Sequence, residues 1–299
     1  MKGSYLSDAF FSRLETMSLN LKTSLSGYFG GKHLVNTYGQ TVEFADFREY
    51  QLGDDIRRID WNLYSRFEKY FLKLFTDERQ MQVQIFLDCS ASMGKDNVKK
   101  ANFAVATAAS MGFLAVNNMD KLNFQIMKGG KAENPFGNIV GKTAFFRSIG
   151  ALESIEFSGD VDVDACVTKC PDTGTNNGIT IIISDFLTDD NWKKAVDYLC
   201  YKRRQVMLVQ ILSPEEVGPG YDGRVNLIDS ESEDIADTRN MKIRITRAMR
   251  QAYEEAFNDF LADINNYCKK RSVDYISIVS DGAVEKALFG ELLKAGIMS

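Results

Sequence analysis

The stretch VQIFLDCSAS, residues 83–92, is a short apolar run that ends in one aspartate and two serines. Residues 83–87 predict a buried β-strand, because the run is short, apolar and rich in β-branched and aromatic side chains. An alanine-rich helix is expected next, from about 97 to 116. A strand that leads directly into a helix is the beginning of an α/β unit.

The same alternation continues toward the C-terminus. Further strands are expected at about 122–126, 179–183, 206–212 and 275–279, and further helices at about 144–155, 190–200, 245–270 and 283–294. The run 179–183 is continuously apolar, as in a parallel strand that is buried on both faces. The pattern predicts an α/β fold with a doubly wound, mainly parallel sheet.

The first 80 residues depart from this pattern. An apolar stripe over 6–25 predicts a helix, and 32–80 is expected to form short strands and loops, with one strand at 70–75. The prediction is therefore an N-terminal helix-plus-β accessory unit over 1–80 and a main domain over 81–299. Within the main domain, 213–245 is expected to be a β excursion, with the 32–80 segment as a candidate pairing partner.

The composition is that of a globular protein. The 299 residues are 44% hydrophobic and 26% charged, with 36 basic against 41 acidic residues. Basic residues are not in excess, so the composition does not indicate nucleic-acid binding. No apolar run reaches the roughly 18 to 20 residues that span a bilayer, and the first residues lack the apolar core of a signal peptide. The expected localisation is cytoplasmic, with no nucleic acid and no membrane span.

The polar residues after two of the strands predict a metal site. Asp88, Ser90 and Ser92 follow the strand at 83–87, and Asp185 follows the strand at 179–183. Ligands of doubly wound sheets bind where the strands end. Carboxylate and hydroxyl oxygens suit Mg²⁺, or Mn²⁺ or Ca²⁺, better than zinc or copper. An open coordination position on such an ion would attract an acidic group of a partner. The alternative is that Asp88 caps the helix that follows.

The Asp88-x-Ser90-x-Ser92 motif resembles the metal-ion-dependent adhesion site of von Willebrand factor A domains. The preceding segment resembles domain-of-unknown-function family 58, which couples such a segment to an A-type domain. The resemblance rests on Gly39, 43–45, Arg48, Glu49, Tyr50, Gly53, Asp54, Asp55, Arg57, Ile59, Asp60, Trp61, Arg66 and Lys73.

The resemblance implies partners and ligand roles. Members of the family are often encoded beside MoxR-type AAA+ ATPases and are thought to act with them as adaptors, so the expected partners are such an ATPase and an unknown client protein. Asp88, Ser90 and Ser92 match the first metal loop, and Asp185 matches an aspartate that acts through water. Val161 stands where the family has a threonine ligand; Asp160 or Asp162 could substitute for it.

The charged residues around Trp61 have two interpretations. Arg48, Asp54, Asp55, Arg57, Arg58, Asp60 and Arg66 are expected either to form an internal network that fixes the accessory unit to the A domain or to face a partner. The two roles are not exclusive.

Enzyme functions find little support in the sequence. A haloacid-dehalogenase-like phosphatase needs a second acid two residues after its aspartate, where this chain has Ser90. The single histidine, His33, follows a glycine-rich stretch at 27–32 whose spacing is wrong for a phosphate-binding loop. The expected function is therefore a non-enzymatic protein–protein interaction module. The alternatives are a metal-dependent phosphoester hydrolase and a metal-free scaffold.

Overall fold

The chain forms two compact units, Met1–Phe29 with Met81–Ser299, and Gly30–Gln80. The structure, a computed structural model, describes residues 5–20, 42–51, 54–77, 81–94, 97–173, 178–187, 192–218, 223–227 and 241–295. The first of these units is called the main unit below, and the second the accessory unit.

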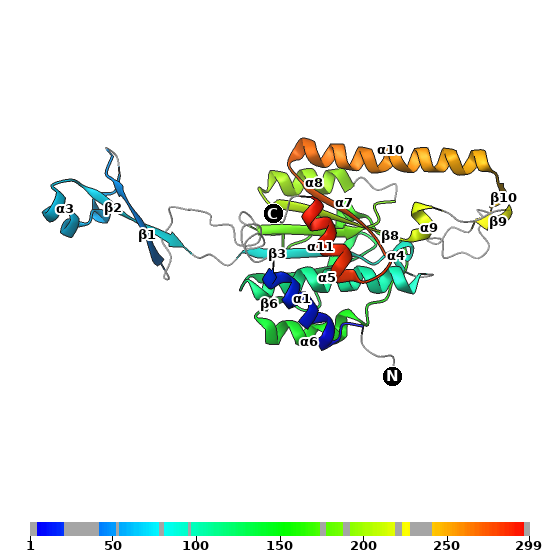
Figure 1. Cartoon of the computed structure of the whole chain (residues 1–299), viewed down its shortest axis with the longest axis horizontal. Helices are drawn as coiled ribbons and strands as arrows, with labels where there is room; N and C mark the ends of the chain where they lie inside the picture. Colours follow the sequence, from blue (N-terminus) through cyan, green and yellow to red (C-terminus); the bar gives the residue numbers. More distant parts are fainter. Residues whose placement is uncertain are drawn as a thin grey trace. The chain divides into compact units, whose positions relative to one another are not determined.

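A seven-stranded sheet lies at the centre of the main unit (Figure 1). Its strands are β3 (Gln82–Asp88), β4 (Lys121–Lys128), β5 (Lys131–Glu133), β6 (Asn138–Val140), β7 (Gly178–Ser184), β8 (Gln205–Leu212) and β11 (Asp274–Val279). The order is β11-β8-β7-β3-β4-β5, and β6 also pairs with β4. The first five strands in this order are parallel, and only β5 and β6 run antiparallel to β4. The predicted doubly wound, mainly parallel sheet is confirmed.

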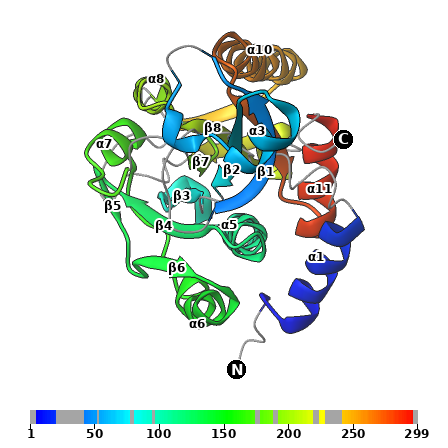
Figure 2. The ribbon, with the colours of Figure 1, turned by 90° about the vertical axis from the view of Figure 1, so that its left-hand side faces the viewer.

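Helices cover both faces of this sheet. They are α1 (Asp8–Asn20), α4 (Ala91–Gly94), α5 (Val98–Asn117), α6 (Lys142–Leu152), α7 (Val163–Thr168), α8 (Trp192–Tyr201), α9 (Pro214–Val217), α10 (Arg247–Arg271) and α11 (Val284–Lys294). Viewed along the strands, α1, α5, α6 and α11 lie on one face and α7, α8 and α10 on the other (Figure 2). Successive residues of β3 divide between the same two layers: Ile85 and Leu87 belong to the α5 core, and Phe86 to the α8 core.

The first helix belongs to the main unit, which corrects the predicted boundary at residue 80. Phe11 and Leu14 of α1 are buried in the core that contains α5. The ring of Phe11 lies 5.3 Å from that of Phe113, and Arg13 forms a 2.6 Å ion pair with Glu285 of α11. The apolar stripe of α1 packs against this large core. The sequence pattern predicts the helix but does not say which core it joins.

The accessory unit contains an antiparallel pair of strands, β1 (Val42–Glu49) and β2 (Phe71–Asp77). Between them lie a short 3₁₀ helix, η1 (Ile56–Arg58), and α3 (Trp61–Phe67). The strand expected at 70–75 is confirmed as β2. The expectation of only strands and loops is wrong for α3, which begins because Asp60 caps the amides of its first turn.

The expected β excursion is a hairpin of β9 (Gly223–Leu227) and β10 (Met241–Ile245). In the part of the chain that the structure describes, these strands pair with each other and not with the accessory unit. His33 and the stretch 27–32 lie outside the described residues. None of the described helices has the length and apolar character that a bilayer crossing requires.

Candidate functional site

The candidate site lies where three neighbouring parallel strands end. β4 lies on one side of β3 and β7 on the other, so the chain changes direction across the sheet between β3 and β7. Asp88 is the last residue of β3, Asp185 directly follows β7, and β8 leads through Ser213 into α9. This carboxyl edge, at the switch point, is where ligands bind in doubly wound folds.

Asp88 is fully buried, and both of its oxygens accept hydrogen bonds. The Ser90 amide donates to Oδ1 at 2.9 Å, and the Ser184 hydroxyl donates to Oδ2 at 2.6 Å. Burial, and then the nearby charge of Asp185, raise the pKa of Asp88 to about 6, against the opposing effect of these hydrogen bonds. The Ser90 amide precedes the first residue of α4, so this hydrogen bond closes the local turn. The hydrogen bond with Ser184 ties β3 to β7.

The two serines of the loop lie together. Their hydroxyl oxygens are 3.0 Å apart, and Ser90 is fully buried while Ser92 is half-buried. The loop then forms α4, which ends at Gly94. A Cβ on Gly94 would lie 2.5 Å from the Cβ of Ala101, so only glycine allows α4 to approach α5 this closely. The position of the serines therefore depends on tight packing against α5.

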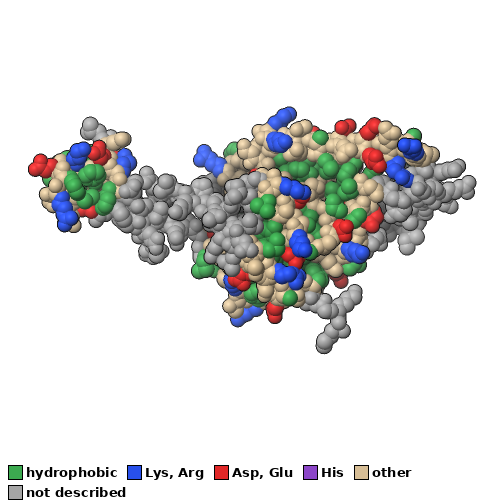
Figure 3. Space-filling view, in the orientation of Figure 1, with side chains coloured by type: hydrophobic (Ala, Val, Ile, Leu, Met, Phe, Trp, Pro, Cys, Tyr) green, Lys and Arg blue, Asp and Glu red, His purple; other side chains and the backbone are tan. Residues whose placement is uncertain are grey.

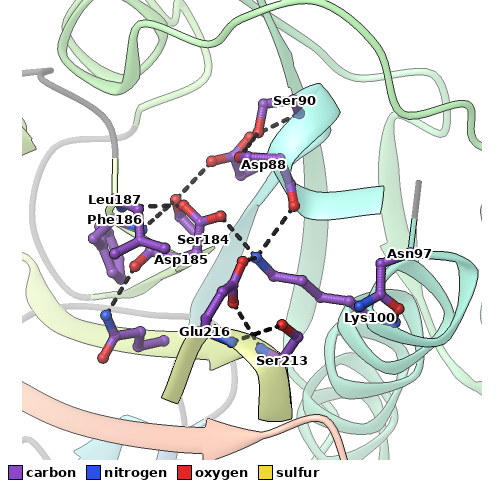
Figure 4. Close-up of polar contacts among 12 residues, drawn as sticks. Asp88, Ser90, Asn97, Lys100, Ser184, Asp185, Phe186, Leu187, Ser213 and Glu216 are labelled. Atoms are coloured by element: carbon purple, nitrogen blue, oxygen red, sulfur yellow. Dashed lines mark hydrogen bonds and ion pairs between the residues drawn. The ribbon is translucent and has the colours of Figure 1, made fainter. Parts of the chain in front are cut away.

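Lys100 of α5 supplies a buried positive charge to this site (Figure 4). Its Nζ donates to Asp185 Oδ2 at 2.8 Å, to Glu216 Oε1 at 2.7 Å and to the Ser92 carbonyl at 3.2 Å. Its side chain is 1% exposed, so all three donors of the ammonium are used inside the protein. Burial alone lowers the pKa of Lys100, but the charges of Asp185 and Glu216 outweigh it and leave that pKa raised. Lys100 therefore stays charged.

Glu216 reaches Lys100 from α9. Its other oxygen accepts from the Ser213 amide at 2.7 Å, and the Ser213 hydroxyl accepts from the Glu216 amide, which together make a capping box. The Tyr253 hydroxyl of α10 donates to the Glu216 carbonyl at 2.7 Å. The side chain of Glu216 is 24% exposed, in contrast to that of Asp185 at 0%. Asp88, Lys100, Ser184, Asp185 and Glu216 are called the Lys100 cluster below.

The turn at 158–162 meets the Asp88 loop through its backbone. The Ser158 amide donates to the Cys89 carbonyl at 2.9 Å, and the Ala91 amide donates to the Gly159 carbonyl at 2.8 Å. Val161 is buried in the core beneath α7 and α8, whereas Asp160 is exposed. Asp162 is exposed and caps α7 through the Ala165 amide. Because its carboxylate already caps α7, Asp162 does not act as a substitute for the missing threonine ligand in this arrangement.

A divalent ion does not fit the site as its residues lie. Asp88, Ser90, Ser92 and Asp185 do come together, as predicted. However, Asp185 already holds the Lys100 ammonium, and both oxygens of Asp88 already accept hydrogen bonds. An ion bound to Asp185 would lie within a few ångströms of this ammonium, in a buried place where like charges repel strongly. The described residues contain no group of three or more His, Cys, Asp and Glu side chains that could hold a metal.

The charged block of the accessory unit forms an internal network within that unit. Arg48 pairs with Asp54 at 2.9 Å. Asp55 caps η1 and Asp60 caps α3. These contacts lie within the accessory unit, and the expected role of the block in fixing that unit to the A domain stays a prediction.

Other side chains of the block are exposed. Arg57 and Arg66 are exposed, and Trp61 is 61% exposed, with its ring beside those of Tyr64 and Tyr70. Figure 3 shows hydrophobic side chains gathered among charged ones on this unit. The block therefore combines helix caps, of which Asp60 is buried, with an exposed aromatic surface.

Sequence reasoning missed Lys100, Ser184 and Glu216. Each is distant in sequence from Asp88, so only the fold brings them together. One signal was present: Lys100 lies in the first turn of α5, where the helix dipole disfavours a cation and where this helix has no acidic residue. Lys99 lies in the same turn, so this signal alone does not distinguish Lys100 from it.

Fold and site define a doubly wound α/β protein with a buried ion-pair cluster at the switch point of its sheet. The chain belongs to the family described as Protein of unknown function DUF58, which matches residues 46–260. Uncharacterized proteins of Mycobacterium bovis and Mycobacterium tuberculosis are each 27% identical to it over 275 residues, covering 90% of this chain and 84% of theirs.

Solved structures give a weaker match. A von Willebrand factor type A structure from Catenulispora acidiphila is 13% identical and covers 46% of this chain and 34% of its own, with a TM-score of 0.32. Proximal thread matrix protein 1 of the mussel byssus is 11% identical and covers 44% of this chain and 36% of its own, with a TM-score of 0.35. Scores this low add nothing to the fold assignment, which rests on the sheet itself.

Proposed function

We propose that the protein is a non-enzymatic protein–protein interaction module that binds its partner at the carboxyl edge of the sheet. The observation that carries the proposal is the Lys100 ammonium, buried between Asp185 and Glu216. In place of a divalent ion, this ammonium would bind an acidic group of the partner once one of its three present acceptors is displaced. The module then needs no resident metal.

The arrangement of the carboxylates supports a binding role over a catalytic one. Asp88 is held by Ser90 and Ser184, and Asp185 by Lys100. Neither is placed as a free nucleophile, and Ser90 occupies the position of the second acid that a phosphatase of this loop type needs. A metal-assisted hydrolase would also require an open position beside Asp185, where Lys100 lies.

The partner we propose is a MoxR-type AAA+ ATPase, with an unknown client protein. Membership in the family supports this pairing, through the association of its members with such ATPases. ATP-driven work would then be done by the ATPase, and this chain would connect it to the client in the cytoplasm.

The test is a binding measurement between this protein and the MoxR-type ATPase of the same organism. Val217, exposed on α9 at the carboxyl edge, is replaced by arginine; the matched control is Val140→Arg, an exposed valine of β6 that pairs with the first residue of β4 at the opposite edge. Binding should weaken at least tenfold in Val217→Arg alone and be unchanged by a chelator. Absent binding, equal effects of both variants, or loss with the chelator would contradict the proposal. Turnover of phosphate esters that disappears in Asp88→Ala would support the hydrolase instead.

A further inference from the structure

The three acceptors of Lys100 differ in how firmly they are held. Ser92 contributes a carbonyl of the loop backbone, and Asp185 is fully buried after β7. Glu216 is the partly exposed member and comes from a separate short helix. Of the two carboxylate acceptors, Glu216 is therefore the one that solvent reaches.

Little apolar surface holds α9 in place. The helix has four residues and none of them is buried. Pro214, Glu215 and Val217 are exposed, and only the side chain of Glu216 reaches the cluster. Among the described residues, α9 is tied to the rest of the main unit by the ion pair of Glu216 with Lys100 and by the Tyr253 hydroxyl on the Glu216 carbonyl. An element with so few buried contacts opens at low cost.

When α9 opens, the Glu216 carboxylate leaves the Lys100 ammonium, so another carboxylate must take its place. A buried ammonium that loses one of its partners without compensation is strongly disfavoured. A carboxylate from outside would restore a charge-assisted hydrogen bond of the same kind and strength. Neutral groups would form weaker hydrogen bonds with the Lys100 ammonium, and cations would be repelled by it.

We propose that Glu216 holds the place of an acidic side chain of the partner. On binding, an aspartate or glutamate of the partner takes its position on Lys100, and α9 moves aside with Glu216. The proposal rests on the function proposed above and specifies the chemistry of the group that this site receives. Because Tyr253 holds the backbone of α9, the exchange also changes the contact between α9 and α10.

Acetate is a suitable probe for the ammonium position, used with the variant Glu216→Ala. The variant should unfold several degrees lower than wild type, and acetate should restore most of this loss in a saturable manner. Chloride at equal ionic strength and methylammonium should not restore it, nor should acetate in Lys100→Met/Glu216→Ala. Failure of acetate to act beyond chloride would overturn the proposed site.

The exchange itself is tested with Glu216→Gln. Glutamine has one acceptor oxygen, so when that oxygen keeps the capping box with the Ser213 amide, the Lys100 ammonium loses its acceptor on α9. Glu215→Gln, the exposed neighbour on α9, is the matched control. Glu216→Gln should bind the ATPase at least threefold more tightly than wild type, since the internal competitor is weakened. Unchanged or weaker binding would mean that Glu216 is a permanent tie.

These outcomes separate the two proposals. A wild-type complex with the ATPase, together with failed acetate rescue, would leave the interaction module standing and remove the exchange. Acetate rescue without any complex would keep the carboxylate site and remove the ATPase as partner.

Discussion

Replacing Lys100 by methionine should destabilise the main unit strongly. Methionine keeps much of the apolar stem but removes the ammonium, so Asp185 is left as a fully buried carboxylate without its cation. Loss of one partner of a buried ion pair costs about 3 to 5 kcal/mol. Glu216 adds little to this, because its side chain is 24% exposed and can turn to water.

The expected change in the unfolding midpoint follows from this free energy. A unit of this size loses roughly 2 to 4 °C per kcal/mol, so the variant should unfold roughly 6 to 20 °C below wild type. The double variant Lys100→Met/Asp185→Asn removes both charges and should recover at least half of the loss.

The fluorescence of Trp192 is a suitable reporter. The chain has two tryptophans; Trp192 is buried in the α8 core and Trp61 is exposed in the accessory unit. In a Trp61→Phe background, thermal and urea unfolding therefore report on the main unit. A loss below about 1 kcal/mol in Lys100→Met, or no recovery in the double variant, would refute the reasoning, since an unpaired buried carboxylate must cost more.

Three further predictions concern other parts of the chain. Gly94→Ala should lower stability by about 1 to 3 kcal/mol in thermal unfolding, because its Cβ would lie 2.5 Å from that of Ala101. Asp60→Ala should remove the cap of α3 and cost the accessory unit about 0.5 to 2 kcal/mol, seen as faster amide exchange in α3 with the exposed Asn62→Ala as the control. Burial raises the pKa of Asp120 to about 6, so the folded state binds a proton that the unfolded chain, titrating near 4, releases. The stability of Asp120→Asn relative to wild type should therefore be higher at pH 8 than at pH 4 by about 1 to 2 kcal/mol, with the change falling between about pH 6 and 4; a difference that is independent of pH would contradict it.

Much of the fold could be predicted from the sequence because the main unit is built on strong periodic signals. The apolar runs at 83–87, 179–183 and 206–212 correspond to β3, β7 and β8, which are buried on both faces. The place of α1 could not be predicted, because its stripe carries no information about which core it joins. Similarly, α3 was missed because a cap such as Asp60 matters only once the neighbouring strands are placed.

The candidate site could be predicted only where its residues follow strand ends. Asp88 and Asp185 were found because parallel strands place their carboxyl ends at one edge. Lys100 and Glu216 were not, because they reach that edge from α5 and from α9, at distances along the chain that no local pattern spans. The sequence therefore predicts a set of metal ligands without the buried ammonium that lies beside Asp185.

Calorimetry with Mn²⁺ and Mg²⁺ tests the central claim most directly. Wild type should give no binding heat at millimolar ion, because the Lys100 ammonium already neutralises Asp185. Lys100→Ala should gain divalent binding that disappears in Lys100→Ala/Asp185→Asn, since removal of the ammonium leaves the carboxylates of Asp185 and Glu216 without their cation. Divalent binding by wild type that is lost in Asp88→Ala would contradict the account and restore the metal-dependent site.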